Sequence, residues 1–187
     1  MQNSLKKTTL LAFALGLSLA SLGFAQQNDS LAFTRAQHLQ RGINTSIWFA
    51  QHPSDYSAER LRTFTTTADL DLIHHLGFDH IRLSIDAAPL LAWQSGQPDG
   101  TAFVGELDRV VKLATQQNLA VIIDIHPESS YKATLFQGTD GVERFAMLWR
   151  ALATHLAPFD PSLVFFEIMN EPEQSDPYRW QGIEAFV

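Results

Sequence analysis

Short apolar runs alternate along the chain with longer segments in which apolar residues recur every three or four positions. Continuous runs of β-branched and aromatic residues are typical of strands, and the wider spacing is typical of amphipathic helices. The runs predict strands over residues 40–49, 80–85, 119–125 and 163–169. The wider spacing predicts helices over residues 68–76, 105–118 and 140–156, with a further helix beginning near Trp180.

This alternation predicts parallel βαβ units, arranged either as a doubly wound sheet or as an α/β barrel. A dinucleotide-binding sheet would carry G-x-G-x-x-G after its first strand, whereas residues 42–48 read GINTSIW, and the chain has no P-loop pattern. Instead, the ends of the expected strands carry polar and aromatic residues: Trp48, Asp86, His126, Asn170 and Glu171. Catalytic side chains of α/β barrels come from the carboxyl ends of the strands, so this arrangement favours the barrel.

The composition narrows the class of protein. A hydrophobic content of 45% with 18% charged residues is typical of a globular domain. The chain has no cysteine, so it must be held by an apolar core and not by disulfides. A net charge of -7 without a basic cluster argues against a nucleic-acid partner.

Residues 1–25 have the pattern of a secretory signal peptide, with Lys6 and Lys7 before an apolar segment and small residues at its end. A membrane anchor is the alternative, but the segment is shorter than the roughly 20 residues that a span needs. We expect cleavage after residue 25, a lead-in over 26–39, a catalytic-domain segment over 40–187, no membrane association after cleavage, and a secreted or periplasmic location.

Four segments taken together resemble glycoside hydrolase family 5, the cellulase-type retaining β-glycosidases. They read RGIN (41–44), LGFDHIRL (76–83), VIIDIH (121–126) and FEIMNEP (166–172). Asn-Glu-Pro alone is a weak signal, whereas four strand motifs in the family's order are much more specific. The resemblance implies a TIM (β/α)8 barrel that hydrolyses a β-linked polysaccharide, in the manner of an endo-β-1,4-glucanase, with no cofactor and no metal.

The resemblance also implies roles for individual residues. Glu171 would be the general acid/base, and Asn170 would bond the 2-hydroxyl of the sugar whose bond is cleaved. Arg82 would lie beneath the site and pair with the nucleophilic carboxylate. His126 would contact the sugar or order the carboxylates, and Trp48 would offer a ring face to a sugar.

Structural roles compete with some of these assignments. Glu171 would also suit a helix start, where the helix dipole favours an acid, and Asn170 would suit a strand-end cap. Arg82 in an apolar strand needs a charged partner, and Asp124 or Glu167 would serve without any catalytic role.

Two further alternatives concern His126 and the segment after the second strand. The Asp-x-His spacing at residues 124–126 suits a metal, but no third ligand is evident, and a core histidine is the other alternative. Residues 87–102 are expected to form a long loop over the cleft, where Trp93 would be a second ring for stacking.

The resemblance covers only the N-terminal half of a barrel. A (β/α)8 barrel takes about 250 residues, and removal of 25 residues from 187 leaves 162. The family's nucleophile, on the seventh strand, has no position here, so we expect the chain alone to be inactive and its open sheet edges to self-associate. The alternatives are a non-catalytic carbohydrate-binding half-barrel and, less favoured by the Asn-Glu pair, a barrel enzyme for sugar phosphates.

Overall fold

The computed structural model describes residues 33–52, 55–135, 140–172 and 176–186. The chain divides into two units, Met1–Gln37 and His38–Val187, and every element discussed below belongs to the second. The predicted signal peptide lies outside the described residues. Within them, no helix is both long and apolar enough to cross a membrane.

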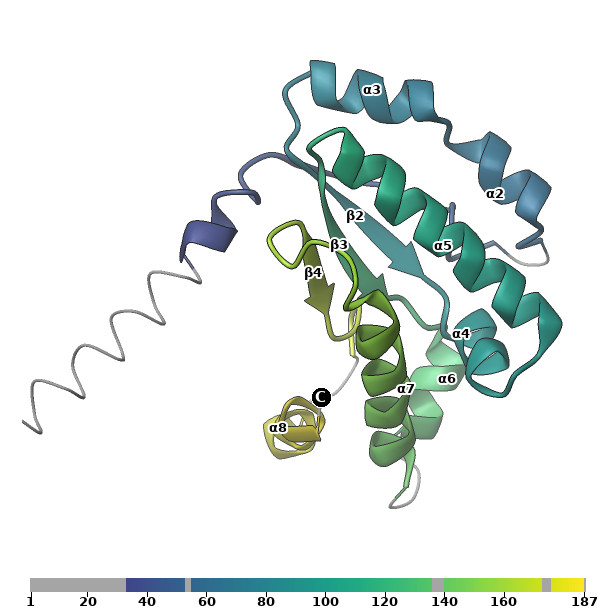
Figure 1. Ribbon diagram of the computed structural model, residues 1–187. Coiled ribbons are helices and arrows are strands. Elements are labelled where there is room, and N and C mark those ends of the chain that lie inside the picture. Colours follow the sequence, from purple (N-terminus) through teal and green to yellow (C-terminus); the bar gives the residue numbers. More distant parts are fainter. Residues whose placement is uncertain (1–32, 53–54, 136–139, 173–175, 187) are drawn as a thin grey trace, which may run out of the picture. The chain divides into compact units, whose positions relative to one another are not determined.

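The described sheet consists of four parallel strands that follow one another in chain order (Figure 1). They are β1 (Gly42–Asn44), β2 (His80–Ile85), β3 (Ala120–Ile125) and β4 (Val164–Glu167). The register places Arg82 opposite Asn44, and Asp124 opposite both Ser84 and Glu167. Because all strands run in one direction, their carboxyl ends lie at the same edge and bring these polar side chains together. The predicted partial α/β barrel is confirmed.

Helices occupy the connections between the strands. They are α2 (Ala58–Phe64), α3 (Thr67–His75), α4 (Ala87–Gln94), α5 (Pro98–Gln116), α6 (Ser129–Leu135), α7 (Gly141–Leu156) and α8 (Pro177–Phe186). The longest helices, α5 and α7, each bury an apolar stripe of the kind that the sequence predicts, and α2 and α3 follow α5 along its length (Figure 1). The core is formed by these stripes and by apolar side chains of β2 and β3, most of which are 0% exposed.

The prediction of a long loop over residues 87–102 is wrong, because α4 and the first turn of α5 occupy this segment. The Asp86 carboxylate caps α4 by accepting a hydrogen bond from a backbone N–H of its first turn. Gly96 then turns the chain with a φ of 74°, and Pro98 begins α5, where its missing N–H has no helical partner to lose. Gly100 lets α5 touch α4, because a Cβ there would lie 2.1 Å from a backbone nitrogen of α4.

The first strand is shorter than predicted, since β1 ends at Asn44 while the prediction extended to residue 49. After it the backbone turns sharply, and both Ile47 and Gln51 have a φ of 62°. Phe49 then returns to the sheet through an isolated bridge beside the last residue of β2. Because this bridge is parallel, the chain bulges between Asn44 and Phe49 and then continues in the direction of β1, which brings Gln51 to the carboxyl edge of the sheet.

Candidate active site

Arg82 is the centre of a charged cluster at the carboxyl edge of the sheet. Its Nε lies 2.6 Å from Glu167 Oε2 and its Nη2 lies 2.5 Å from Glu167 Oε1, so the guanidinium binds this carboxylate with two hydrogen bonds. Nη2 also lies 2.8 Å from Asp124 Oδ2 and 3.1 Å from Asn170 Oδ1. The hydrogen bonds to Glu167, and then the charge of Asp124, raise the pKa of Arg82. Both carboxylates that the sequence offered as partners therefore bind Arg82.

Asp124 lies beneath this cluster and is 0% exposed. Its Oδ2 is shared between the guanidinium of Arg82 and Nδ1 of His126, which lies 3.0 Å away. Its Oδ1 is buried and has no hydrogen-bond partner among the described residues. Burial raises the pKa of Asp124, while the hydrogen bond from His126 and the charge of Arg82 act in the opposite direction.

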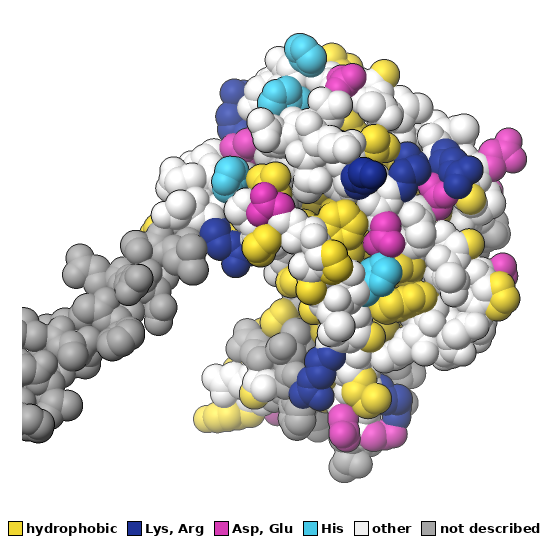
Figure 2. Space-filling model, in the orientation of Figure 1, with side chains coloured by type: hydrophobic (Ala, Val, Ile, Leu, Met, Phe, Trp, Pro, Cys, Tyr) yellow, Lys and Arg dark blue, Asp and Glu magenta, His cyan; other side chains and the backbone are white. Residues whose placement is uncertain are grey.

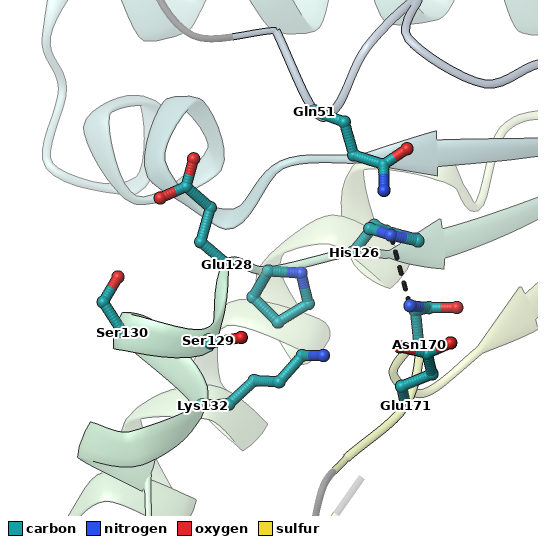
Figure 3. A pocket seen from close by; sticks show the side chains of 9 residues that line it. Gln51, His126, Glu128, Ser129, Ser130, Lys132, Asn170 and Glu171 are labelled. Carbon is teal, nitrogen blue, oxygen red and sulfur yellow. Dashed lines mark hydrogen bonds between the residues drawn. The ribbon is translucent and has the colours of Figure 1, made fainter.

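Asn170 connects the cluster to the surface. Its backbone N–H donates to the carbonyl of Ile125 at 3.0 Å, which ties the end of β4 to β3. Its side-chain Nδ2 lies 3.2 Å from Nε2 of His126, as drawn in Figure 3. The same amide group therefore touches Arg82 through its oxygen and His126 through its nitrogen.

Glu171 follows Asn170 and is exposed at the mouth of the site. Its φ of 43° is in the left-handed region, which is uncommon for residues other than glycine and costs on the order of 1–3 kcal/mol. Such conformations concentrate at functional sites, where the surrounding structure holds them in place. Pro172 comes next and cannot extend the strand, so the carboxylate is presented where β4 has ended.

A pocket of about 530 Å³ opens in front of these residues (Figure 3). Its lining is mostly polar: Gln51, His126, Pro127, Glu128, Ser129, Ser130, Lys132, Asn170 and Glu171. The sequence analysis singled out three of these and missed the wall contributed by Gln51 and by the start of α6. No motif marks that wall, because it is formed by the turn after β1 and by the first residues of a short helix. Its amide, hydroxyl and charged groups suit a ligand rich in hydroxyl groups.

The two tryptophans proposed for stacking do not lie in this pocket. Trp48 is 1% exposed, and its indole N–H donates to the carbonyl of Leu61 at 2.7 Å. The prediction that Trp48 stacks on a sugar is therefore wrong, since the turn after β1 directs its ring into the core. Trp93 is half-buried on α4, where it packs edge-on against the ring of His155 at 5.3 Å.

The charges around the site are mixed. In the part of the chain that the structure describes, no group of three or more His, Cys, Asp or Glu side chains is placed to hold a metal ion. Asp124 and His126, the pair with metal-like spacing, bind each other. On the face shown in Figure 2, acidic and basic side chains are interspersed.

Comparison with known proteins agrees with this geometry. A family model for Cellulase (glycosyl hydrolase family 5) matches residues 34–187. Endoglucanase C of Acetivibrio thermocellus is 30% identical over 152 residues, a match that covers 76% of this chain and 43% of the relative. Cellodextrinase A of Ruminococcus flavefaciens is 30% identical over 147 residues, covering 73% and 41%. The chain belongs to glycoside hydrolase family 5.

A solved structure shows the same relation in three dimensions. The endoglucanase Cel5A of Thermotoga maritima superposes with a TM-score of 0.63 at 27% identity, over 82% of this chain and 48% of that one. The matched part is the partial barrel described above. The chain thus spans less than half the length of these relatives and about half of this structural neighbour.

Proposed function

We propose that this chain supplies the acid/base side of a β-glycan hydrolase site that works by retaining double displacement, with Glu171 as the acid/base. The observation that carries the proposal is the position of Glu171. Its carboxylate follows an anchored asparagine, lies at the mouth of a polar pocket and is held by a backbone in the left-handed region. In the first step it would protonate the leaving oxygen, and in the second it would activate the attacking water.

The neighbouring side chains have supporting roles in this proposal. Asn170 would donate a hydrogen bond to the 2-hydroxyl of the sugar whose bond is cleaved, a contact that strengthens in the transition state. His126 lines the pocket and would contact the same sugar or order the carboxylates. Arg82 holds the amide oxygen of Asn170 and places positive charge beneath the site.

A retaining mechanism needs a second carboxylate about 5–5.5 Å from the first. Asp124 is wholly buried, and neither Asp124 nor Glu167 lines the pocket, so neither is placed to attack a bound sugar. Glu128 lies across the pocket from Glu171, and Figure 3 shows its carboxylate turned away. We therefore propose that the 187-residue chain alone does not hydrolyse glycans, and that activity belongs to a gene product that supplies the nucleophile.

The proposed substrate is a β-linked polysaccharide, of the cellulose, β-glucan or mannan type. Structures of the neighbouring Thermotoga maritima Cel5A are described in complex with cellobiose and with mannotriose, which supports this choice. We also propose that the protein is secreted or periplasmic, on the strength of the signal-like residues 1–25. An exported protein that retains residue 1, shown by its intact mass, would contradict cleavage.

The direct test compares hydrolysis of cellotetraose by the complete gene product and by its Glu171→Gln variant. Loss of a general acid/base is expected to lower kcat by about 10²- to 10⁴-fold. Glu143→Gln, an exposed acid in the first turn of α7, is the matched control and should leave kcat unchanged. Equal activity of Glu171→Gln and the unmodified protein would refute the role of Glu171. Sugar release by the 187-residue chain that Glu171→Gln abolishes would support that role but refute the proposal that this chain alone is inactive.

A non-catalytic carbohydrate-binding protein is the second candidate. The observation in its favour is that, among the described residues, Glu128 is the one carboxylate besides Glu171 that lines the pocket, and Figure 3 shows it turned away. Such a protein would bind cellotetraose, measured by calorimetry on the complete gene product, without releasing shorter sugars. Turnover in the same sample would exclude it.

A further inference from the structure

Asp124 touches no part of the pocket, yet two of the proposed site residues are connected through it. We propose that Asp124 is a positioning residue: it fixes the tautomer of His126 and, through it, the orientation of the Asn170 side-chain amide. Only the last step, in which Asn170 meets a sugar hydroxyl, rests on the proposed function.

The proposal starts from a closed ring of four side chains. Asp124 Oδ2 lies 2.8 Å from Arg82 Nη2 and 3.0 Å from His126 Nδ1. His126 Nε2 lies 3.2 Å from Asn170 Nδ2, and Asn170 Oδ1 lies 3.1 Å from Arg82 Nη2. Each member of the ring therefore contacts two others. Asp124 is the member that is 0% exposed, so no solvent competes for its bonds.

The chemistry of the ring allows one arrangement of protons. An ionised carboxylate only accepts hydrogen bonds, so the nitrogen of His126 that faces Asp124 must carry the proton. In a neutral imidazole the other nitrogen then accepts, and the atom of Asn170 that faces it must be the amide NH₂. Arg82 only donates, so the amide oxygen must face Arg82. Both neighbours of Asn170 thus demand the same orientation.

This orientation determines what Asn170 presents to a ligand. The amide nitrogen has two N–H groups, and the bond to His126 uses one of them. Because Asn170 lines the pocket, its second N–H can donate a hydrogen bond to a hydroxyl group of a ligand. With the amide reversed, its oxygen would face His126 and its NH₂ group would face the donors of Arg82.

Asp124→Leu is the informative variant because it removes the acceptor. Asp124→Asn would not, since its amide oxygen could replace Oδ2 and accept from both Arg82 and His126. In Asp124→Leu a proton on Nδ1 of His126 has no acceptor, and a proton on Nε2 faces the NH₂ group of Asn170. Rotation of the Asn170 amide would only move the conflict to Arg82, so the ring has no fully bonded arrangement in this variant.

The test is the ¹⁵N NMR spectrum of the histidine rings in the 187-residue chain at about pH 8, above the usual histidine pKa of about 6.5. We expect the proton of His126 on Nδ1 in the unmodified chain and on Nε2, at least in part, in Asp124→Leu. Asp108→Leu is the matched control, because Asp108 accepts from Nε2 of His155 at 2.8 Å on the helical layer. It should alter His155 alone.

Two results would overturn the proposal: a proton on Nε2 of His126 in the unmodified chain, or an unchanged tautomer in Asp124→Leu. If the variant does not fold, as judged from its backbone amide spectrum, the spectrum of the unmodified chain still tests the proposal. A scalar coupling across the hydrogen bond from Asn170 Nδ2 to His126 Nε2 is then the expected result, and a proton found on Nε2 refutes the proposal.

Kinetics of the complete gene product test the functional step. Asp124→Leu is expected to lower kcat on an aryl β-cellobioside by about 10- to 100-fold with KM changed less than about threefold, because the lost contact strengthens in the transition state. The loss should disappear with the 2-deoxy substrate, which lacks the hydroxyl. An equal loss on both substrates would refute this step. Failure of Glu171 as acid/base would leave the NMR result unaffected, so the two failures are distinguishable.

Discussion

Replacement of Arg82 by Met should destabilise the protein strongly, because the guanidinium compensates a carboxylate that water cannot reach. Arg82 is 23% exposed on its side chain, and Asp124 beside it is 0% exposed. Removal of one partner of a buried ion pair typically costs about 3–5 kcal/mol, since the other charge is left uncompensated. Glu167, 36% exposed on its side chain, is partly solvated and should add little. We expect the free energy of unfolding to fall by about 3–5 kcal/mol, most of it through Asp124.

The assay is urea unfolding of the 187-residue chain, followed by far-ultraviolet circular dichroism, with the slope of the transition checked for constancy. Arg144→Met is the matched control: Arg144 and Asp140 form an exposed pair on α7, with side chains 58% and 65% exposed. Such a pair is worth about 0–1 kcal/mol. If Arg82→Met costs no more than Arg144→Met, the account of the buried cluster is refuted.

The pH dependence gives an internal check on the same variant. Burial already raises the pKa of Asp124 above its usual value, and Arg82 opposes that rise. Without Arg82 the folded state should favour protonated Asp124 still more. A raised folded pKa gives a penalty that is absent below the unfolded pKa of about 3.9, grows from there to the folded pKa and is constant above it. The difference in unfolding free energy between variant and unmodified protein should therefore be largest near pH 8 and disappear as the pH falls toward about 4; a difference that persists there would contradict the assignment to Asp124.

Other predictions follow from packing and from the sheet edges. Gly100→Ala should weaken the contact of α5 with α4 and lower the unfolding midpoint, because the new Cβ would lie 2.1 Å from the backbone nitrogen of Trp93. Gly105→Ala should instead raise the free energy of unfolding by up to about 1 kcal/mol, because its Cβ would have no neighbour within 4 Å. Thermal unfolding of both variants measures the difference. Because β1 and β4 are the end strands of the described sheet, we expect the isolated chain to self-associate, and a stable monomer in sedimentation velocity would contradict this.

Much of the fold could be predicted from local patterns. The strand over residues 80–85 and the helices ending near residues 75 and 156 were predicted almost to the residue, because continuous and periodic apolar positions mark them. The missed helix α4 has a uniformly apolar sequence with no stripe to reveal it, and its signals, the Asp86 cap and Gly96, are single residues. Local sequence therefore predicts elements with one buried face better than short, evenly apolar ones.

Site residues at the ends of strands could be predicted from the sequence, whereas those placed by a turn were missed. The ion pairs of Arg82 could be predicted because a buried charge needs a partner. The register of β2, β3 and β4 brings two carboxylates, those of Asp124 and Glu167, next to it. Trp48 was misplaced because the chain bulges at Ile47, where φ is positive, before Phe49 pairs again with β2, and strand periodicity cannot foresee that bulge. Gln51 reaches the pocket through the same turn.

The central claim, that Glu171 is the acid/base, is tested most directly by chemical rescue of Glu171→Ala in the complete gene product. With 2,4-dinitrophenyl β-cellobioside, whose leaving group needs no protonation, the first step should stay fast and the second should become limiting. Added azide should then accelerate turnover and yield β-cellobiosyl azide, while cellotetraose stays uncleaved. An equal loss on both substrates, without rescue by azide, would contradict the assignment of Glu171.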